Sequence, residues 1–463
     1  MTFDPQIMSP QISLWQRIVK MFQYRHVGLI GLAWCALFLA SVIGASGVLQ
    51  PVAFGMASTV SRTFLPHDKG GRTNILLLGV GDKDHAGASL TDSIIIASIE
   101  PATRSIVFLS LPRDLYLVGS DQAPDARINA FYANVRNRLI REGASASGAS
   151  IAAMNILRQE LGSKLGAQIH GVIKVDFTAF SEIVDAFGGV EIDVAESLTD
   201  YTYPLKEGVV GTFSLPQGLQ RLDGDTALQY ARSRHSTSDF DRSRRQQQIL
   251  GALLEQVKNQ NPLENLGLAR AVLGVIEKHA EWTLSSGDLV ALASSVLTVP
   301  RERIASMHLS TAVGGDYSDA ERGGFVLPPA EDIGAGAILL PYSLTGKISD
   351  WGQLETLTQL LFEHRALYLL QSDISISARA KDRLAARRLR NELVRYGLSV
   401  SEITQHVSGS GEILLSSRGQ TEKFISSYLD LPLTVSPDIS DDAMKIILPE
   451  RYRFVPLEIF GQL

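Results

Sequence analysis

Asn74-Ile-Leu-Leu-Leu-Gly-Val-Gly-Asp82 is the stretch that opens the folded part of the chain. A short apolar run that ends in glycines is typical of a buried strand that leads into a tight loop. Two further apolar runs, residues 90–98 and 105–114, follow it and are separated by a Pro-containing turn. Apolar periodicity then predicts helices over residues 149–165 and 177–187. Strands and helices in this order predict a layered α/β fold.

Charged residues occur where these predicted strands begin or end. Asp92 lies at the start of the second run, and Arg113 and Asp114 close the third. Ligand sites of layered α/β folds gather at strand ends, so we expect these side chains to share one pocket. Mg²⁺ bound to phosphates is typically held by one or two carboxylates plus waters, which makes Asp92 the first candidate for a metal ligand. The alternative for each acidic residue alone is a cap of a turn or a helix.

A basic segment, residues 228–248, concentrates arginines around two aspartates in a chain whose net charge is −6. The planar fork and permanent charge of a guanidinium suit phosphate groups. Arg232 and Arg234 are predicted to project to one face of an extended segment. A helix is predicted to follow from Asp239 or Asp241, and three side chains share one of its faces: Arg242, Arg245 and Gln246. The alternative is a solvated basic helix with internal Asp–Arg pairs.

Taken together, these motifs resemble those of the LytR-CpsA-Psr family, membrane-anchored bacterial enzymes that attach glycopolymers to the cell wall. The matching blocks are Asn74-Ile-Leu-Leu-Leu-Gly79, Thr91-Asp92-Ser93, Ser110-Leu-Pro-Arg-Asp114, Arg127-Ile-Asn-Ala130, Asp185-Ala-Phe-Gly-Gly-Val190, Gly218 through Arg234, and Asp239 to Gln248. Their order and spacing over residues 74–250 carry the resemblance, and no single block would suffice.

The resemblance implies a phosphotransferase that moves a glycopolymer from a polyprenyl-pyrophosphate carrier to a peptidoglycan hydroxyl, with pyrophosphate cleavage as a side activity. It implies Mg²⁺ or Mn²⁺ as the cofactor, a hydrophobic pocket for the lipid tail, and Asp92 as metal ligand and catalytic residue. The implied catalytic arginines are Arg113, Arg232 and Arg234. The implied substrate-binding residues are Arg127, Arg242, Arg245 and Gln246, with Arg127 and Arg245 as supports. Independently, a metal with several arginines suits the charge that develops on a transferred phosphoryl group.

Two positions depart from the family's pattern. Gly81 stands where a Gly-x-Asp carboxylate is usual, and Leu90 stands where an arginine precedes the Asp-containing block. Asp82, one residue later, is the candidate second metal ligand. Asp82 and Asp92 are also candidates for the base that deprotonates the acceptor hydroxyl. The alternative function is therefore a non-catalytic regulatory protein that binds the wall or a polyprenyl phosphate.

Residues 27–50 carry no charged side chain and are long enough to cross a hydrocarbon layer of roughly 30 Å as a helix. Basic residues precede this run, so the positive-inside rule places residues 1–26 in the cytoplasm and everything after residue 50 outside the cell membrane. The alternatives are a cleaved signal peptide and a buried core helix. The pI near 5.9 argues against a nucleic-acid partner, and the single cysteine, Cys35, excludes an intrachain disulfide.

The expected fold class is α/β: an α-β-α layered extracytoplasmic domain around a central mixed sheet, after one N-terminal transmembrane helix, plus a small C-terminal α/β domain. Residues 51–72 are expected to form a linker. The catalytic domain is expected over 73–370, with its core at 73–260 and helices across 251–300. The C-terminal domain, which weakly resembles the LytR C-terminal type, is expected over 371–463.

Overall fold

The computed structural model describes residues 65–460 with gaps at 82–88, 207–208, 234–244, 246–247, 250–251, 253–274, 276–277, 298, 310–323, 330–336, 343–346, 348–349, 370–372, 406–410, 417–419 and 441–442. The predicted anchor at 27–50 and the candidate site residues Asp82, Arg234, Arg242 and Gln246 lie outside the described residues. Within the described ranges, no helix combines the length and the apolar composition that a membrane span requires.

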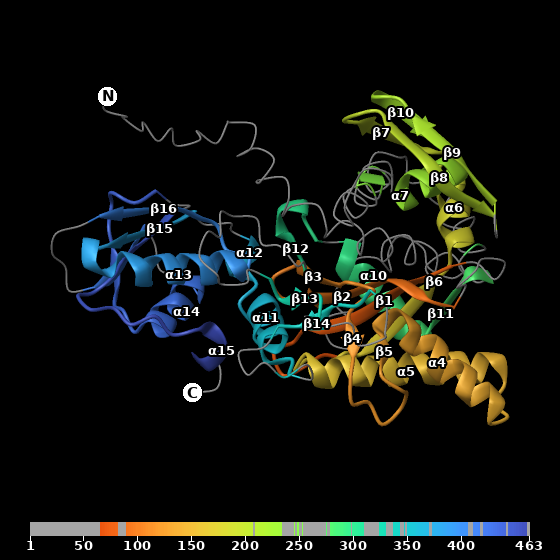
Figure 1. Ribbon diagram of the computed structural model, residues 1–463, viewed down its shortest axis with the longest axis horizontal. Coiled ribbons are helices and arrows are strands. Elements are labelled where there is room, and N and C mark those ends of the chain that lie inside the picture. Colours follow the sequence, from red (N-terminus) through yellow and green to blue (C-terminus); the bar gives the residue numbers. More distant parts are fainter. Residues whose placement is uncertain are drawn as a thin grey trace, which may run out of the picture.

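A six-stranded sheet forms the centre of the molecule (Figure 1). Its strands, in spatial order, are β11 (Ala280–Trp282), β6 (Gly171–Val175), β1 (Thr73–Val80), β2 (Thr91–Glu100), β3 (Ser105–Leu111) and β12 (Ile304–His308). β1 pairs antiparallel with β2 and parallel with β6, and β3 pairs antiparallel with β2 and parallel with β12. This mixed sheet confirms the α/β class predicted from the sequence.

Helices cover both faces of the sheet. One face carries α4 (Ile128–Arg141), α5 (Ala146–Lys164) and α11 (Gly352–Glu363); the other carries α6 (Phe177–Ala186), α7 (Gly224–Arg232) and α10 (Ser286–Leu297). Successive residues of β1 alternate between the layers: Leu76 and Leu78 pack with the first set, and Ile75 and Leu77 with the second. Because both faces are buried, the strands are continuous apolar runs.

Capping residues set the ends of the helices on the second face. At the start of α6, the Asp176 carboxylate accepts a hydrogen bond of 2.9 Å from the Ala179 backbone N–H. At the start of α10, Ser285 Oγ accepts from the Asp288 N–H at 3.1 Å, and the Asp288 carboxylate accepts from the Ser285 N–H at 3.2 Å. This reciprocal arrangement makes Ser285 the N-cap of α10.

The structure corrects two predictions. Arg232 does not lie on an extended segment, because α7 continues to Arg232; the Asp223 carboxylate caps this helix by accepting from the Thr226 N–H at 2.8 Å. The buried residues Ala227, Tyr230 and Ala231 have the three- and four-residue spacing of a helical face, which outweighs the alternation of the two arginines. The predicted helical region 251–300 is interrupted by β11, whose backbone pairs with the edge of β6.

A lobe of two small sheets stands beside α6 and α7 (Figure 1). β7 (Val190–Val194) pairs with β10 (Gly218–Leu222), and β8 (Leu198–Lys206) forms a hairpin with β9 (Val209–Leu215). The outer side chains Tyr201 and Val210 are 64% and 66% exposed, as expected for a surface hairpin. Tyr203 and Phe213 instead point inward and pack with their ring centroids 5.9 Å apart.

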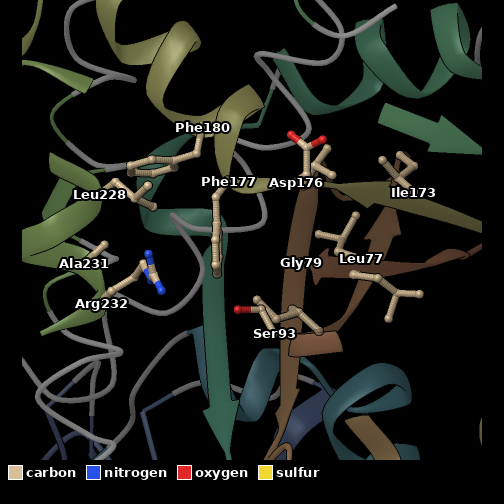
Figure 2. Close-up of a pocket in the computed structure, with 13 residues that line it drawn as sticks. Leu77, Gly79, Ser93, Ile173, Asp176, Phe177, Phe180, Leu228, Ala231 and Arg232 are labelled. Carbon is tan, nitrogen blue, oxygen red and sulfur yellow. The ribbon is translucent and has the colours of Figure 1, made fainter. Parts of the chain in front are cut away.

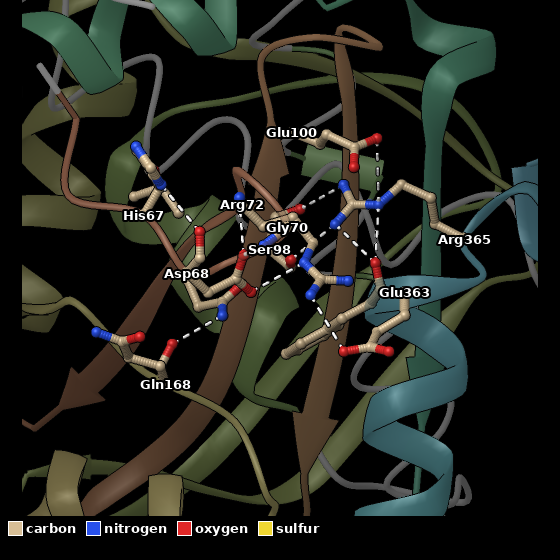
Figure 3. A network of polar contacts seen from close by, with 12 residues as sticks. His67, Asp68, Gly70, Arg72, Ser98, Glu100, Gln168, Glu363 and Arg365 are labelled. Atoms are coloured by element: carbon tan, nitrogen blue, oxygen red, sulfur yellow. Dashed lines mark hydrogen bonds and ion pairs between the residues drawn. The ribbon is translucent and has the colours of Figure 1, made fainter. Parts of the chain in front are cut away.

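A buried arginine ties the β2–β3 turn to the helical layer (Figure 3). Arg365 is 4% exposed, and its guanidinium donates to the backbone oxygens of Ser98 and Ser105 at 3.3 and 3.4 Å. Burial lowers the pKa of Arg365 to about 10. Beside it, Arg72 donates to Asp68 at 2.9 Å and to Glu363 at 3.1 Å, which fixes the first described residues against α11.

The C-terminal residues build a second sheet, drawn in blue in Figure 1. Its strands, in spatial order, are β16 (Val400–Gln405), β15 (Asp373–Ala378), β19 (Ala443–Ile447), β17 (Glu412–Leu415) and β18 (Leu433–Val435), and it carries α13 (Arg383–Arg395), α14 (Gln420–Leu429) and α15 (Leu457–Phe460). α12 (Ala366–Leu369) leads into it. The rings of Phe325 and Tyr396 meet edge to face at 5.0 Å across the boundary, so the two sheets share one apolar core.

Short pairs complete the elements that the structure describes. They are β4 (Tyr116–Leu117) with β5 (Ala126–Arg127), and β13 (Val326–Leu327) with β14 (Leu340–Pro341). The first pair leads directly into α4 and so places the start of that helix near the ends of β2 and β3.

Candidate functional site

Four strand ends meet at one edge of the central sheet. Gly79 near the end of β1 pairs with Ser93 near the start of β2 and with Val175 at the end of β6, and Leu111 at the end of β3 pairs with Ile94. The residues that follow or flank these ends therefore gather in one region. The charged ends of the apolar runs lie together, as we expect from the sequence.

Asp92 occupies a β-bulge at this edge. The register passes from Gly79–Ser93 directly to Val80–Thr91, so Asp92 has no partner residue on β1. A bulge bends a strand locally and re-aims a side chain, and such irregularities are frequent beside functional sites. The Asp92 side chain is 40% exposed, so a ligand from solvent can reach its carboxylate.

Asp92 belongs to a group of five polar side chains in contact: two aspartates, two arginines and one asparagine amide. Asp92 Oδ1 accepts from Arg113 Nη1 at 3.3 Å and from Asn129 Nδ2 at 3.4 Å. On its other side Arg113 Nε lies 3.6 Å from Asp114 Oδ2, and Asp114 Oδ1 lies 3.5 Å from Arg127 Nη1. The structure thus brings together three predicted site residues, Asp92, Arg113 and Arg127, and holds the two arginines through Asp114.

Asn129 belongs to this group although the sequence predicts no role for it. It lies within the quoted block Arg127-Ile-Asn-Ala130, and that position is the signal that could have found it. Its side chain is 3% exposed, and its Oδ1 has no hydrogen-bond partner within the described structure. A buried amide oxygen without a donor commonly signals a missing water or ion.

The donor set around Asp92 fits a hard divalent cation. The accessible Asp92 carboxylate is an oxygen ligand of the kind that Mg²⁺ takes, with waters and substrate phosphates completing its shell. Among the described residues there is no group of three or more His, Cys, Asp or Glu side chains that would form an all-protein cage. The donors therefore suit a cation that is bound jointly with a phosphate ligand.

An apolar pocket opens on the other face of the same edge (Figure 2). Its volume is about 70 Å³, several times the roughly 10–15 Å³ that one water molecule needs. Apolar walls come from β1, β2, β6 and the helices above them, including Leu77, Ile95, Ile173, Phe180 and Leu228. Its polar lining consists of Gly79, Ser93, Asp176 and Arg232, so the pocket has one acidic and one basic side chain in its wall.

Arg232 reaches this pocket from the last turn of α7. Its guanidinium carbon lies 4.5 Å from the centroid of the Phe177 ring and 5.8 Å from that of Tyr203. Figure 2 shows the guanidinium extending from α7 toward the Phe177 ring. A cation over an aromatic face is attracted by the ring quadrupole. The predicted site residue Arg232 is thus held at the mouth of an apolar pocket.

Arg245 lies behind α7 and is 5% exposed. Its Nε donates to the Tyr230 carbonyl at 2.9 Å, and its Nη2 donates to the Ser233 carbonyl. These are carbonyls at the C-terminal end of α7, which a cation stabilises. Arg245 therefore supports the end of α7 that carries Arg232.

Four other predicted site residues, Asp82, Arg234, Arg242 and Gln246, lie outside the described residues. In the sequence, Asp82 comes two positions after Val80, the last residue of β1. Arg234 comes directly after Ser233, the residue that follows α7. Their predicted roles stay predictions.

Comparison with known proteins gives one family. The profile of the LytR_cpsA_psr family matches residues 52–326, more than half of the chain. A polyisoprenyl-teichoic acid–peptidoglycan teichoic acid transferase TagU from Oceanobacillus iheyensis is 29% identical over 203 residues, which are 43% of this chain and 56% of that protein. The regulatory protein MsrR of Staphylococcus aureus is 30% identical over 197 residues, 42% of this chain and 52% of that protein.

The chain thus spans just over half the length of these two relatives. Among solved structures, the crystal structure of B. subtilis TagV superposes with a TM-score of 0.44 at 20% identity, covering 64% of this chain and 99% of that one. The profile match spans the β1 strand, the Asp92 bulge, Arg113 and the arginine-bearing end of α7. The chain belongs to the LytR_cpsA_psr family.

Proposed function

We propose that the protein transfers a glycopolymer from a polyprenyl-pyrophosphate carrier to a hydroxyl of peptidoglycan. Membership of the LytR_cpsA_psr family supports the proposal, as does the relative named as a polyisoprenyl-teichoic acid–peptidoglycan teichoic acid transferase. The proposal concerns the class of donor, a lipid-linked glycan, and the class of acceptor, a wall hydroxyl.

The observation that carries the proposal is an apolar pocket with a guanidinium at its mouth. Arg232 lines the same cavity as Leu77, Ile173 and Phe180. A ligand that suits it combines a hydrocarbon chain with an anionic head, because burial of the chain is favourable and the guanidinium binds phosphate oxygens. A polyprenyl pyrophosphate has this composition.

The transfer is a substitution at phosphorus. The acceptor hydroxyl oxygen attacks the phosphorus that carries the glycan, a new P–O bond forms, and the bond to the bridging pyrophosphate oxygen breaks. Polyprenyl monophosphate leaves, and the hydroxyl proton passes to a base, for which Asp92 and Asp82 are the candidates. Arg113 and Arg232, with Arg234 as a further proposed contact, neutralise charge on the transferred phosphoryl group and the leaving phosphate.

The proposed cofactor is Mg²⁺ or Mn²⁺, held by Asp92 with Asp82 as a proposed second carboxylate. Bound there, the ion supplies Lewis-acid polarisation of phosphate oxygens. Arg113 is fixed beside Asp92 at 3.3 Å and keeps the carboxylate oriented. Arg127 and Arg245 complete the proposal as supports, and Arg242 and Gln246 as substrate contacts.

Residues 27–50 are proposed as a single-pass anchor that places the pocket outside the cytoplasmic membrane. Their uncharged composition supports this arrangement. A lipid-linked donor remains in the bilayer, so an anchored enzyme and its substrate share one surface. A reporter fusion at the C-terminus, active only outside the cytoplasm, tests the topology.

The alternative is a regulatory protein that binds the lipid-linked anion without turnover. Two observations support this alternative: one relative is named regulatory protein MsrR, and Gly81 and Leu90 depart from the family's pattern. The two functions differ in whether polyprenyl phosphate is released.

The deciding experiment measures release of polyprenyl phosphate by the full-length chain in detergent, with a synthetic polyprenyl-pyrophosphate glycan and peptidoglycan fragments. Metal-dependent turnover that is lost in Asp92→Ala, lowered but still measurable in Arg232→Ala, and retained in the exposed-arginine control Arg387→Ala, supports the transferase. Tight binding of the lipid with no turnover in any metal supports the regulatory alternative.

A further inference from the structure

The hairpin β8–β9 makes contacts with the arginine-bearing end of α7 that the proposed chemistry does not by itself require. Tyr203 of β8 is 3% exposed, and its ring centroid lies 5.8 Å from the Arg232 guanidinium carbon. Phe177, the first residue of α6, lies against the same guanidinium at 4.5 Å. Two aromatic rings from different elements therefore contact one guanidinium.

The same hairpin also holds the residue after Arg232. Ser233 Oγ donates to Asp200 Oδ2 at 2.9 Å, and both residues are buried. Asp200 Oδ1 in turn accepts from the Thr202 N–H at 3.0 Å. The hairpin is thus attached to α7 both at the Arg232 side chain and at the next position in the chain.

Arginine has a long, flexible side chain, and a guanidinium that must be ordered on binding loses conformational freedom at that moment. Rings that hold it in place beforehand remove part of this cost and keep the donors aimed at the site. Burial raises the pKa of Tyr203, and the nearby charge of Arg232 acts in the opposite direction.

We propose that the hairpin β8–β9, through Tyr203, is the positioning element of Arg232, with Phe177 as the opposing ring. This inference rests on the proposed function in that it assigns Arg232 to the anionic head of the ligand. Phe177 also lines the apolar pocket, whereas Tyr203 is not among the pocket's lining residues. Substitution of Tyr203 therefore tests the positioning of the arginine without changing the surface that would bind a hydrocarbon chain.

The test compares Tyr203→Leu, Tyr203→Phe and a fold control in the full-length chain. The control is Leu215→Ala, which removes a buried side chain from the same hairpin at the Leu198–Leu215 pair, away from Tyr203. Tyr203→Leu is expected to lower kcat/KM about tenfold, as expected for loss of a partly buried cation–π contact, with most of the loss in kcat. Tyr203→Phe keeps the ring and is expected to lose less, and Leu215→Ala is expected to keep kcat/KM while lowering Tm.

Two readouts distinguish positioning from general damage. In the Arg232→Ala background, Tyr203→Leu is expected to cause no further loss of kcat/KM, because the residue acts through the arginine. In ¹⁵N spectra of arginine side chains, the Nε–H signal of Arg232, assigned by Arg232→Ala, is expected to move in Tyr203→Leu and to stay in Leu215→Ala.

Two results overturn the inference and leave the transferase proposal intact. One is that the losses of kcat/KM from Tyr203→Leu and Arg232→Ala are additive in the double variant. The other is that the Arg232 Nε–H signal does not move in Tyr203→Leu. Conversely, wild-type turnover by Arg232→Ala overturns the role of Arg232 in the proposed function. In that case, an Arg232 signal that moves in Tyr203→Leu still establishes the aromatic contact. The contact then has no role in transfer, so the inference fails together with the proposed function.

Discussion

Arg113 Nη1 lies 3.3 Å from Asp92 Oδ1, although the two residues are 21 positions apart in the chain. The contact arises because β2 and β3 pair antiparallel, which places the start of one strand beside the end of the other. Asp92 leaves the ladder through a bulge, and Asp114 holds the opposite side of the Arg113 guanidinium. The arginine is therefore fixed between two carboxylates before any ligand arrives, as an electrostatic site for a phosphate requires.

Replacing Arg113 by lysine tests whether the fork geometry matters. Lysine keeps the charge but loses the planar pair of donors, so we expect kcat/KM for transfer to fall by about 10- to 100-fold. The free energy of unfolding should change by less than about 1 kcal/mol, because partly exposed ion pairs contribute little. Initial rates and urea denaturation measure the two effects. A rate equal to that of the unaltered chain would show that Arg113 contributes only charge.

Replacing Arg245 by methionine is expected to destabilise the fold by about 2 kcal/mol. The buried guanidinium donates to carbonyls of Tyr230 and Ser233, and these acceptors lose their charged donor when it is removed. Urea denaturation of Arg245→Met beside Arg387→Met, an arginine exposed on α13, gives the comparison. Equal midpoints for the two variants would contradict the assignment of Arg245 as a support of α7.

Gly224 controls the distance between α6 and α7. A Cβ at this position would lie 2.1 Å from the Ser181 carbonyl oxygen, so Gly224→Ala must push α7 away from α6. We expect a loss of about 1–3 kcal/mol in the free energy of unfolding, as for other overpacked sites. Transfer should also slow, because Arg232 is at the far end of the displaced helix.

Gly218→Ala is the matched control for this change. Gly218 has φ of +106°, and a Cβ added there would meet no atom within 4 Å, so its replacement introduces backbone strain without a clash. It should lower stability by about 1 kcal/mol and leave kcat unchanged. If both glycine variants lose activity equally, the separation of α6 and α7 is not what positions Arg232.

Stability is expected to fall as the pH is lowered from about 6.5 towards 4. Burial lowers the pKa of His308 to about 4 and also lowers the pKa values of His170 and His364. The unfolded chain binds these protons near pH 6.5 and the folded chain does not, so protonation favours unfolding across this window. Glu458 acts in the opposite direction, because burial raises its pKa.

Urea denaturation at pH 7.5, 6.0 and 5.0 measures this dependence. His308→Gln should reduce the slope of stability against pH, whereas replacement of the exposed His67 should leave it unchanged. An identical slope in His308→Gln would show that His308 does not cause the acid sensitivity.

The sequence by itself determined which segments become strands and where several helices begin. The apolar runs at 74–80 and 105–111 are buried on both faces, so composition alone identifies them, and Ser285 with Asp288 specifies a helix start within four residues. Such signals are local, and they survive whatever the rest of the fold does. The prediction that Arg232 lies on an extended segment was wrong, because a two-residue spacing of arginines competed with a helical apolar face.

Only the tertiary structure decided the polar contacts that the sequence does not predict. The contact of Asn129 with Asp92, the burial of Arg245 behind α7, and the aromatic rings that flank Arg232 all join segments that are distant in the chain. They depend on strand register, including the bulge at Asp92, and on the placement of β6 beside β1. A shift of one residue would turn each side chain to the opposite face, and local sequence preferences do not specify that register.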